Sequence, residues 1–158
     1  MLILLVDDEE AIVNILRSLL KEKGHDVLSA RNGQEALGRL KQVKFDLVIS
    51  DIYMPVMDGI KFHDTLRAVP EYAKLPFLFI SGYDDKYTAG AVRDPRYEGF
   101  WEKTKSVDLL VSWIDYFALP EKKRPPRRPD GVLIPPFVDE HPENIQPKSD
   151  KKGGETPS

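Results

Sequence analysis

Five short apolar runs alternate with segments of helical periodicity over the first 120 residues, and this alternation limits the possible folds more than any other feature. We expect the runs to be strands, at residues 2–6, 26–30, 45–50, 77–81 and 98–102. We expect helices at residues 10–23, 33–43, 60–68, 84–94 and 107–117. Elements that alternate in this way form a parallel sheet with helices on both faces and right-handed crossovers. The predicted fold class is therefore α/β, with a doubly wound five-stranded sheet.

Composition excludes several classes of protein. The 158 residues contain no cysteine, which rules out disulfides, thiolate metal sites and a cysteine nucleophile. The net charge of −3 gives no general reason to expect nucleic-acid binding. No apolar run approaches the length of about 18 residues that a membrane span requires, and the start, MLILLVDDEE, lacks the pattern of a signal peptide. We therefore expect a cytoplasmic protein without a membrane span.

The composition changes at residue 120. Most of the prolines lie beyond it among many charged side chains, and such a segment buries too little apolar surface to offset its ordering entropy. We therefore predict a folded domain over residues 1–119 and a disordered tail over residues 120–158. The basic run KKRPPRR at 122–128 suits either a solvated spacer, which we favour, or contact with an anionic partner. The apolar run VLIPPFV at 132–138 is a weaker candidate for docking on the domain or on a partner.

Polar side chains lie at the ends of four predicted strands: Asp7 and Asp8, Asp51, Ser81, and Lys103. In α/β sheets, ligand sites form at the carboxyl ends of strands, where the strand order reverses. Three carboxylates gathered there repel each other unless a cation intervenes, and oxygen-only ligands suit Mg²⁺. A metal, an ammonium group and a hydroxyl around one carboxylate form a receptor for a phosphoryl group. Asp51 is thus a candidate nucleophile that forms an aspartyl phosphate.

Other notable residues suggest structural roles. The segment MPVMDG after Asp51 is expected to turn the chain sharply, and we expect its Gly59 to adopt backbone angles that other residues resist. The histidines at positions 25, 63 and 141 lie far apart, without a second ligand type at useful spacing. We interpret His25, His63 and His141 as surface residues, and Trp101 as a core residue.

Four segments, LLVDDEE, DLVISDIYMPVMDG, FLFISGYDD and GFWEKT, resemble the signature segments of response-regulator receiver domains from two-component signalling, in content, order and spacing. The resemblance covers roughly residues 1–119. It implies a flavodoxin-like (βα)5 sheet with strand order 2-1-3-4-5. The chain is most similar to the stand-alone, chemotaxis-regulator-like type. That type has no DNA-binding domain, so we expect output through contact with a downstream protein or through onward phosphotransfer.

The resemblance implies a role for each carboxylate at the strand ends. Asp51 takes a phosphoryl group from a phosphohistidine on a sensor histidine kinase or a histidine phosphotransfer protein. Asp8, Asp51 and the backbone carbonyl of Tyr53 bind Mg²⁺ directly, and Asp7 acts partly through water. The chain catalyses its own phosphotransfer and dephosphorylation, and it is not otherwise an enzyme.

The resemblance also implies a switch. Lys103 contacts the phosphoryl oxygens, Ser81 moves to hydrogen-bond the phosphoryl group, and Phe100 rotates inward behind it. This movement changes the surface formed by the fourth helix, the fifth strand and the fifth helix. Tyr53 and Tyr83 occupy positions that modulate the lifetime of the phosphoryl group in the family, and we expect their rings to shield it from water.

Two features depart from the family pattern. Thr104 follows the lysine where the family usually has a proline after a cis peptide bond, and a cis bond before a non-proline residue costs roughly 2.5–4 kcal/mol. We therefore expect a trans bond and a shifted loop at Lys103. Gly90 and Pro95 disfavour helix in the fourth helical segment, which we expect to be short.

Two alternative functions remain open. A phosphorylation-independent binding module would keep the fold without the switch. Thr104 and the unusual fourth helical segment favour this alternative, and the three clustered carboxylates argue against it. An aspartate-nucleophile phosphohydrolase would also use Mg²⁺ and an aspartyl phosphate. Such enzymes typically carry a DxD motif after the first strand. Here the paired acids are adjacent, and the candidate acceptor, Asp51, follows the third strand. Turnover of a free phosphomonoester would favour the hydrolase.

Overall fold

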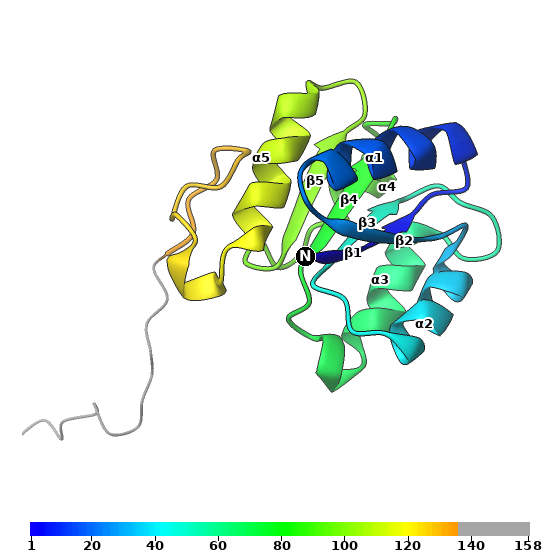
Figure 1. Cartoon of the computed structure of the whole chain (residues 1–158). Coiled ribbons are helices and arrows are strands. Elements are labelled where there is room, and N and C mark those ends of the chain that lie inside the picture. The colour runs from blue at the N-terminus through cyan, green and yellow to red at the C-terminus, as the bar shows by residue number, and fades with distance from the viewer. Residues whose placement is uncertain (136–158) are drawn as a thin grey trace, which may run out of the picture.

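A computed structural model describes residues 1–135 of the chain, and Figure 1 shows how their elements are arranged. The strands are β1 (Leu2–Val6), β2 (Asp26–Ala30), β3 (Leu47–Asp51), β4 (Phe77–Ser81) and β5 (Glu98–Glu102). The helices are α1 (Glu10–Glu22), α2 (Gly33–Gln42), α3 (Gly59–Arg67), α4 (Lys86–Ala89) and α5 (Val107–Ala118). Two short 3₁₀ turns are η1 (Pro70–Tyr72) and η2 (Glu121–Lys123).

The five strands form one parallel sheet in the order β2-β1-β3-β4-β5, as predicted. α1 and α5 cover one face of the sheet, and α2 and α3 cover the other (Figure 1). Because side chains alternate along each strand, β1 supplies Ile3 and Leu5 to the first layer of core and Leu4 and Val6 to the second. This layout brings the carboxyl ends of all five strands to one edge of the sheet.

The fourth helix is shorter than the predicted span of 84–94, since α4 contains only the four residues Lys86–Ala89. A capping box starts it: the Asp85 side chain accepts from the Thr88 N–H, and the Thr88 hydroxyl accepts from the Asp85 N–H. Gly90 ends it at once. The local signals that we expected to weaken this helix therefore limit it to about one turn.

The described part of the tail is packed against the domain, so the prediction of disorder is wrong for residues 120–135. η2 follows α5, and Arg127 and Leu133 form an antiparallel bridge. Arg128 is buried, with 4% of its surface exposed. The aromatic end of α5 provides the surface on which this segment rests, as described below. Residues 136–158, and with them the end of the apolar run at 132–138, lie outside the described residues.

The structure contradicts the surface prediction for His63 and confirms the core prediction for Trp101. His63 is not a surface residue: it is 2% exposed and its Nε2 lies 2.6 Å from Glu98 Oε1. His25 is partly buried, with Nδ1 3.2 Å from the N-terminal amine. Trp101 lies in the core as predicted, with 5% of its surface exposed. His141 lies outside the described residues.

Candidate functional site

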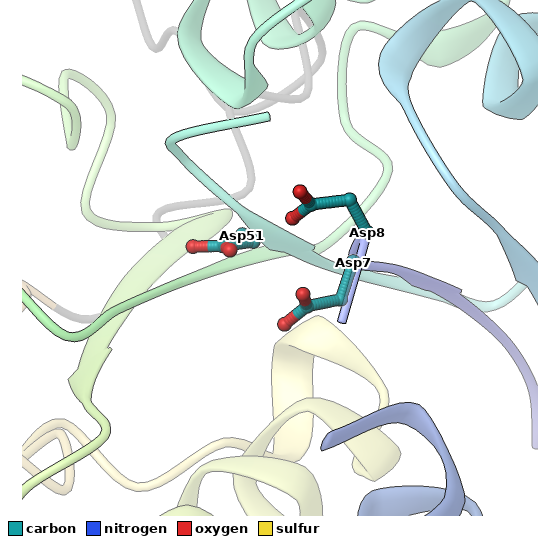
Figure 2. A group of neighbouring side chains, drawn as sticks. All are labelled: Asp7, Asp8 and Asp51. Atoms are coloured by element: carbon teal, nitrogen blue, oxygen red, sulfur yellow. The ribbon is translucent and has the colours of Figure 1, made fainter. Parts of the chain in front are cut away.

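Three carboxylates meet where β1 and β3 end. β1 and β3 are neighbours in the sheet, and the strand order reverses at β1, which lies between β2 and β3. Asp7 and Asp8 directly follow β1, and Asp51 is the last residue of β3. One oxygen from each of the three lies within 4.8 Å of the others. Figure 2 shows the Asp8 side chain above that of Asp7, with the Asp51 carboxylate to the left of both.

Burial differs among the three acids. Asp7 and Asp51 are 1% and 6% exposed, whereas Asp8 is open to solvent. Burial, together with the charge of Asp7, raises the pKa of Asp51 from 3.8 to about 6, although Lys103 and the Ile52 N–H oppose the rise. The Asp51 carboxylate is therefore ionised at neutral pH, but at a cost in free energy that a further cation would relieve.

Lys103 reaches the carboxylates from the end of β5. Its Nζ donates to Asp7 Oδ2 at 3.0 Å and to Asp51 Oδ2 at 3.2 Å. Burial opposes its charge, but the hydrogen bond to Asp7 and the charge of Asp51 raise the pKa of Lys103 above its ordinary value. All peptide bonds among residues 1–135 are trans, including the one before Thr104. The expected loop shift does not keep Lys103 from the site, because the backbone N–H of Lys103 still bonds the Ser81 carbonyl at 2.8 Å.

The turn after Asp51 requires a glycine for a reason that differs from the predicted one. Gly59 does not have a positive φ; the positive φ in this turn belongs to Val56, at 68°. A Cβ on Gly59 would lie 2.0 Å from the Asp51 carbonyl oxygen. Gly59 is therefore needed for space, since its backbone packs directly on the residue that carries the candidate acceptor.

Ser81 and Phe100 lie on the two strands beyond β3. Ser81 is fully buried at the end of β4, and its Oγ accepts from the Tyr83 N–H at 3.1 Å. Phe100 is partly buried on β5 and packs with the core layer beneath α2 and α3. Ser81 is therefore on the strand next to Asp51, whereas Phe100 pairs with Phe79 of β4 and lies one strand further away.

A group of three tyrosines lies beside the site. The Tyr53 ring contacts the Tyr83 ring edge-on, at 5.4 Å between centroids, and the Tyr87 ring at 5.8 Å. The Tyr53 hydroxyl donates to Asp85, the N-cap of α4, and the Tyr87 hydroxyl donates to Asp58, the N-cap of α3, at 2.6 Å. These crossed hydrogen bonds join the loop after β3 to α4.

Tyr53 and Tyr87 keep their hydroxyl protons at neutral pH. The hydrogen bond to Asp85 raises the pKa of Tyr53 to about 12, and burial with the hydrogen bond to Asp58 raises the pKa of Tyr87 to about 12. Tyr87 was not predicted to be a neighbour of the site. Aspartates before helices signal N-caps, but no sequence signal indicates which tyrosine bonds each cap.

The doubly wound sheet thus carries an acid triplet and a lysine at its switch point. A model of the response regulator receiver domain matches residues 3–115. The chain therefore belongs to the response regulator receiver domain family.

Individual relatives agree with this assignment. The chain is 38% identical over 85 residues to the alkaline phosphatase synthesis transcriptional regulatory protein PhoP of Bacillus subtilis, which covers 54% of this chain and 35% of that protein. The chemotaxis response regulator CheY4 of Vibrio cholerae is 27% identical, with a TM-score of 0.66, covering 73% of this chain and 97% of that one. TrrA of Thermotoga maritima, solved with Mg²⁺-BeF, is 27% identical, with a TM-score of 0.63 and the same coverage.

The chain spans little more than a third of the length of PhoP and 23% of the transcriptional regulatory protein ZraR of Klebsiella oxytoca. Within residues 1–135, no helix combines the length and apolar character needed to cross a membrane.

Proposed function

We propose that the chain is a response regulator whose Asp51 accepts a phosphoryl group from a phosphohistidine. A carboxylate oxygen of Asp51 attacks phosphorus, the bond between phosphorus and the imidazole nitrogen breaks, and the imidazole leaves with the electron pair. The observation that carries this proposal is the position of Asp51. It lies at a sheet switch point, between two other carboxylates and a lysine ammonium. The donor is a sensor histidine kinase or a histidine phosphotransfer protein.

The acid cluster fits a divalent cation. Asp8, Asp51 and the backbone carbonyl of Tyr53 would hold Mg²⁺, because hard oxygen donors suit this ion. Both oxygens of Asp7 already accept hydrogen bonds, from the Glu9 N–H at 2.9 Å and from Lys103 at 3.0 Å. This occupancy supports an indirect role for Asp7, through water. The ion would supply positive charge to the phosphoryl oxygens.

The residues on β4 and β5 would read the phosphoryl group. The Lys103 ammonium is already beside Asp51 and would pair with a phosphoryl oxygen. The Ser81 Oγ accepts from the Tyr83 N–H, so its own proton is available to a phosphoryl oxygen. Phe100 would turn inward as Ser81 moves, and the surface of α4, β5 and α5 would change for a downstream protein. A cytoplasmic location for this signalling stays a prediction.

Tyr53 and Tyr83 would lengthen the life of the phosphoryl group by restricting water. Their rings are in contact beside the acid cluster, and Tyr53 is also held by Asp85. We expect faster hydrolysis in Tyr53→Ala and Tyr83→Ala, and little change in Tyr53→Phe, which keeps the ring. Unchanged hydrolysis rates in both alanine variants would exclude shielding.

The test of the function is the intact mass of the chain after incubation with acetyl phosphate and Mg²⁺. We expect a gain of one phosphoryl group, about 80 Da, which disappears in Asp51→Asn or without the metal. Asp46→Asn is the matched control, because Asp46 is exposed just before the start of the same strand. An adduct that survives in Asp51→Asn would contradict the proposal. No adduct with either acetyl phosphate or a phosphorylated kinase would favour the alternative, a phosphorylation-independent binding module.

A further inference from the structure

A segment after the last helix lies along α5 (Figure 1). We call residues 120–135 the strap. Its centre is Arg128, which is 4% exposed and places its guanidinium 4.8 Å from the centre of the Trp113 ring. The same guanidinium donates to the Pro95 carbonyl at 2.5 Å and to both carboxylate oxygens of Asp130, at 3.1 and 2.7 Å. Arg128 is therefore a packed side chain with a fixed set of partners.

A second arginine repeats this arrangement nearer the end of α5. The Arg124 guanidinium lies 5.3 Å from the Phe117 ring and 5.8 Å from the Tyr116 ring. It donates to the Arg96 carbonyl at 3.2 Å and to the Leu119 carbonyl at 3.1 Å. Cations over aromatic faces gain electrostatic attraction, and more so when they are desolvated. Two arginines of the basic run thus face the domain.

The surface beneath the strap is built from α5 and the loop before β5. The Trp113 ring packs so closely on β5 that a Cβ on Gly99 would lie 2.7 Å from it. The indole is thus held between the backbone of β5 and the Arg128 guanidinium. The carbonyls of Pro95 and Arg96 are aligned beside it as acceptors.

The strap also has hydrogen bonds of its own. The Arg128 N–H donates to the Val132 carbonyl at 2.9 Å, and the Ile134 N–H donates to the Pro126 carbonyl at 2.8 Å. Gly131, with φ of +84°, makes the turn between them. The neighbouring Arg127 is exposed and lies in the same segment.

We propose that the aromatic face of α5 and the carbonyls of residues 95 and 96 form an arginine-binding surface, and that its resident ligand is the chain's own strap. Because the strap is tethered directly to α5, its effective concentration favours the intramolecular contact over a separate partner. Another protein then gains this surface only after the strap leaves. This proposal does not depend on phosphorylation of Asp51.

Amide hydrogen exchange on the full chain tests whether the strap is seated. We expect the N–H groups of Arg128 and Ile134 to be protected in the wild type and in the matched control Arg127→Ala. In Arg128→Ala we expect at least tenfold faster exchange at these two positions, with exchange in the sheet unchanged. Exchange at the rate of an unfolded peptide in the wild type would overturn the proposal. So would equal loss of protection in both variants.

A synthetic peptide of residues 120–135 tests the surface itself. The full chain carrying Arg124→Ala and Arg128→Ala should bind this peptide saturably, while the wild type, whose surface is occupied, should bind it at least tenfold more weakly. If the alanine variant does not fold, the variant carrying Arg124→Lys and Arg128→Lys replaces it as the protein that binds the peptide. The indole signal of Trp113 reports binding, and that of Trp101, bonded to the Ser106 carbonyl at 3.1 Å, serves as the internal reference. A peptide that leaves the Trp113 signal unchanged at saturating concentration would overturn the proposal.

Discussion

Two buried carboxylates at opposite ends of the sheet have opposite electrostatic environments. Asp51 ends β3 and is 6% exposed, and Glu98 begins β5 and is 2% exposed. Because the strands are parallel, Asp51 lies where the strands end and Glu98 lies where they begin, on opposite sides of the same sheet along the strand direction. Burial alone would raise the pKa of both. Their partners decide the outcome.

Glu98 is surrounded by donors. Its Oε1 lies 2.6 Å from His63 Nε2 and 3.2 Å from Arg67 Nε. Its Oε2 accepts from the backbone N–H groups of Arg93 at 2.7 Å and Asp94 at 3.0 Å. Burial opposes the charge, but the hydrogen bond from His63 and those from the two N–H groups lower the pKa of Glu98 to about 2. The carboxylate is fully compensated by the chain itself.

Asp51 has one cation and two neighbouring acids, and its pKa is raised to about 6. The difference from Glu98 is not burial but the balance of charges. A cluster that the chain leaves short of positive charge suits an external cation, whereas a cluster that the chain neutralises serves to hold the loop before β5. Removing each carboxylate should therefore have opposite effects on stability.

The largest effect is expected for Glu98→Gln. The substitution leaves His63, Arg67 and two N–H groups without a charged acceptor in a buried place, and losing one partner of a buried pair costs roughly 3–5 kcal/mol. Urea unfolding at pH 7 measures the loss. Glu102→Gln is the matched control at the other end of the same strand, where the side chain is partly exposed and bonds Thr104. A loss below 1 kcal/mol for Glu98→Gln would mean that the cluster does not stabilise the fold.

Asp51→Asn is expected to raise stability by about 1–2 kcal/mol at pH 7 without metal. The substitution removes a buried charge, and the folded state raises the pKa of Asp51 by about two, to about 6, with the opposing effect of Lys103 already included. A rise of about two corresponds to nearly 3 kcal/mol, and the polar amide of the buried asparagine keeps part of this cost. Urea unfolding in the presence of a chelator measures the gain. A clear loss of stability would show that Lys103 compensates Asp51 more fully than the geometry indicates.

The sequence was sufficient to predict which side chains gather around Asp51 at the carboxyl ends of the strands. A carboxylate at the end of a buried strand is a local signal, and parallel pairing brings such ends to one edge whatever the details of packing. The positions of Asp7, Asp8, Asp51 and Lys103 follow from this rule together with the family motifs. The strand order and the short fourth helix were predicted for similar reasons, since each rests on local or family-wide patterns.

The Glu98 end could not be predicted in this way. His63 lies on α3 and Glu98 on β5, and only the packing of α3 across β4 and β5 brings them together. A lone histidine or glutamate carries no signal for such a partner. The prediction of disorder for the strap failed for a related reason. Composition measures apolar content, and it gives no sign of arginines that stack on an aromatic helix face.

The pH dependence of the two substitutions should differ in sign and in range. Because the folded state raises the pKa of Asp51, ionisation of this acid lowers the stability of the wild type as the pH rises from 3.8 through about 6. The gain in stability from Asp51→Asn should therefore shrink as the pH falls from 7 to 4. An acid with a lowered folded-state pKa contributes stability above 4.5 and loses it as pH falls toward about 2, so the deficit of Glu98→Gln should stay constant from pH 7 to 5. Unfolding free energies at pH 7, 6, 5 and 4 give both curves. Parallel curves would contradict the contrast between the two ends.

The smallest effect concerns Mg²⁺ affinity below neutral pH. A metal binds the ionised form of its ligands, so protons compete for Asp51 once the pH falls below about 6. The apparent affinity should be nearly constant from pH 8 to 7 and should then fall, approaching about tenfold per pH unit. Calorimetric titration at fixed ionic strength measures it.

Glu102→Gln should follow the same profile, because Glu102 is not among the clustered acids. A profile that stays flat down to pH 5 would mean either that Asp51 does not bind the ion or that its pKa is not raised. Carbon NMR of the Asp51 carboxyl without metal separates these two cases, since only the first allows a titration midpoint near 6.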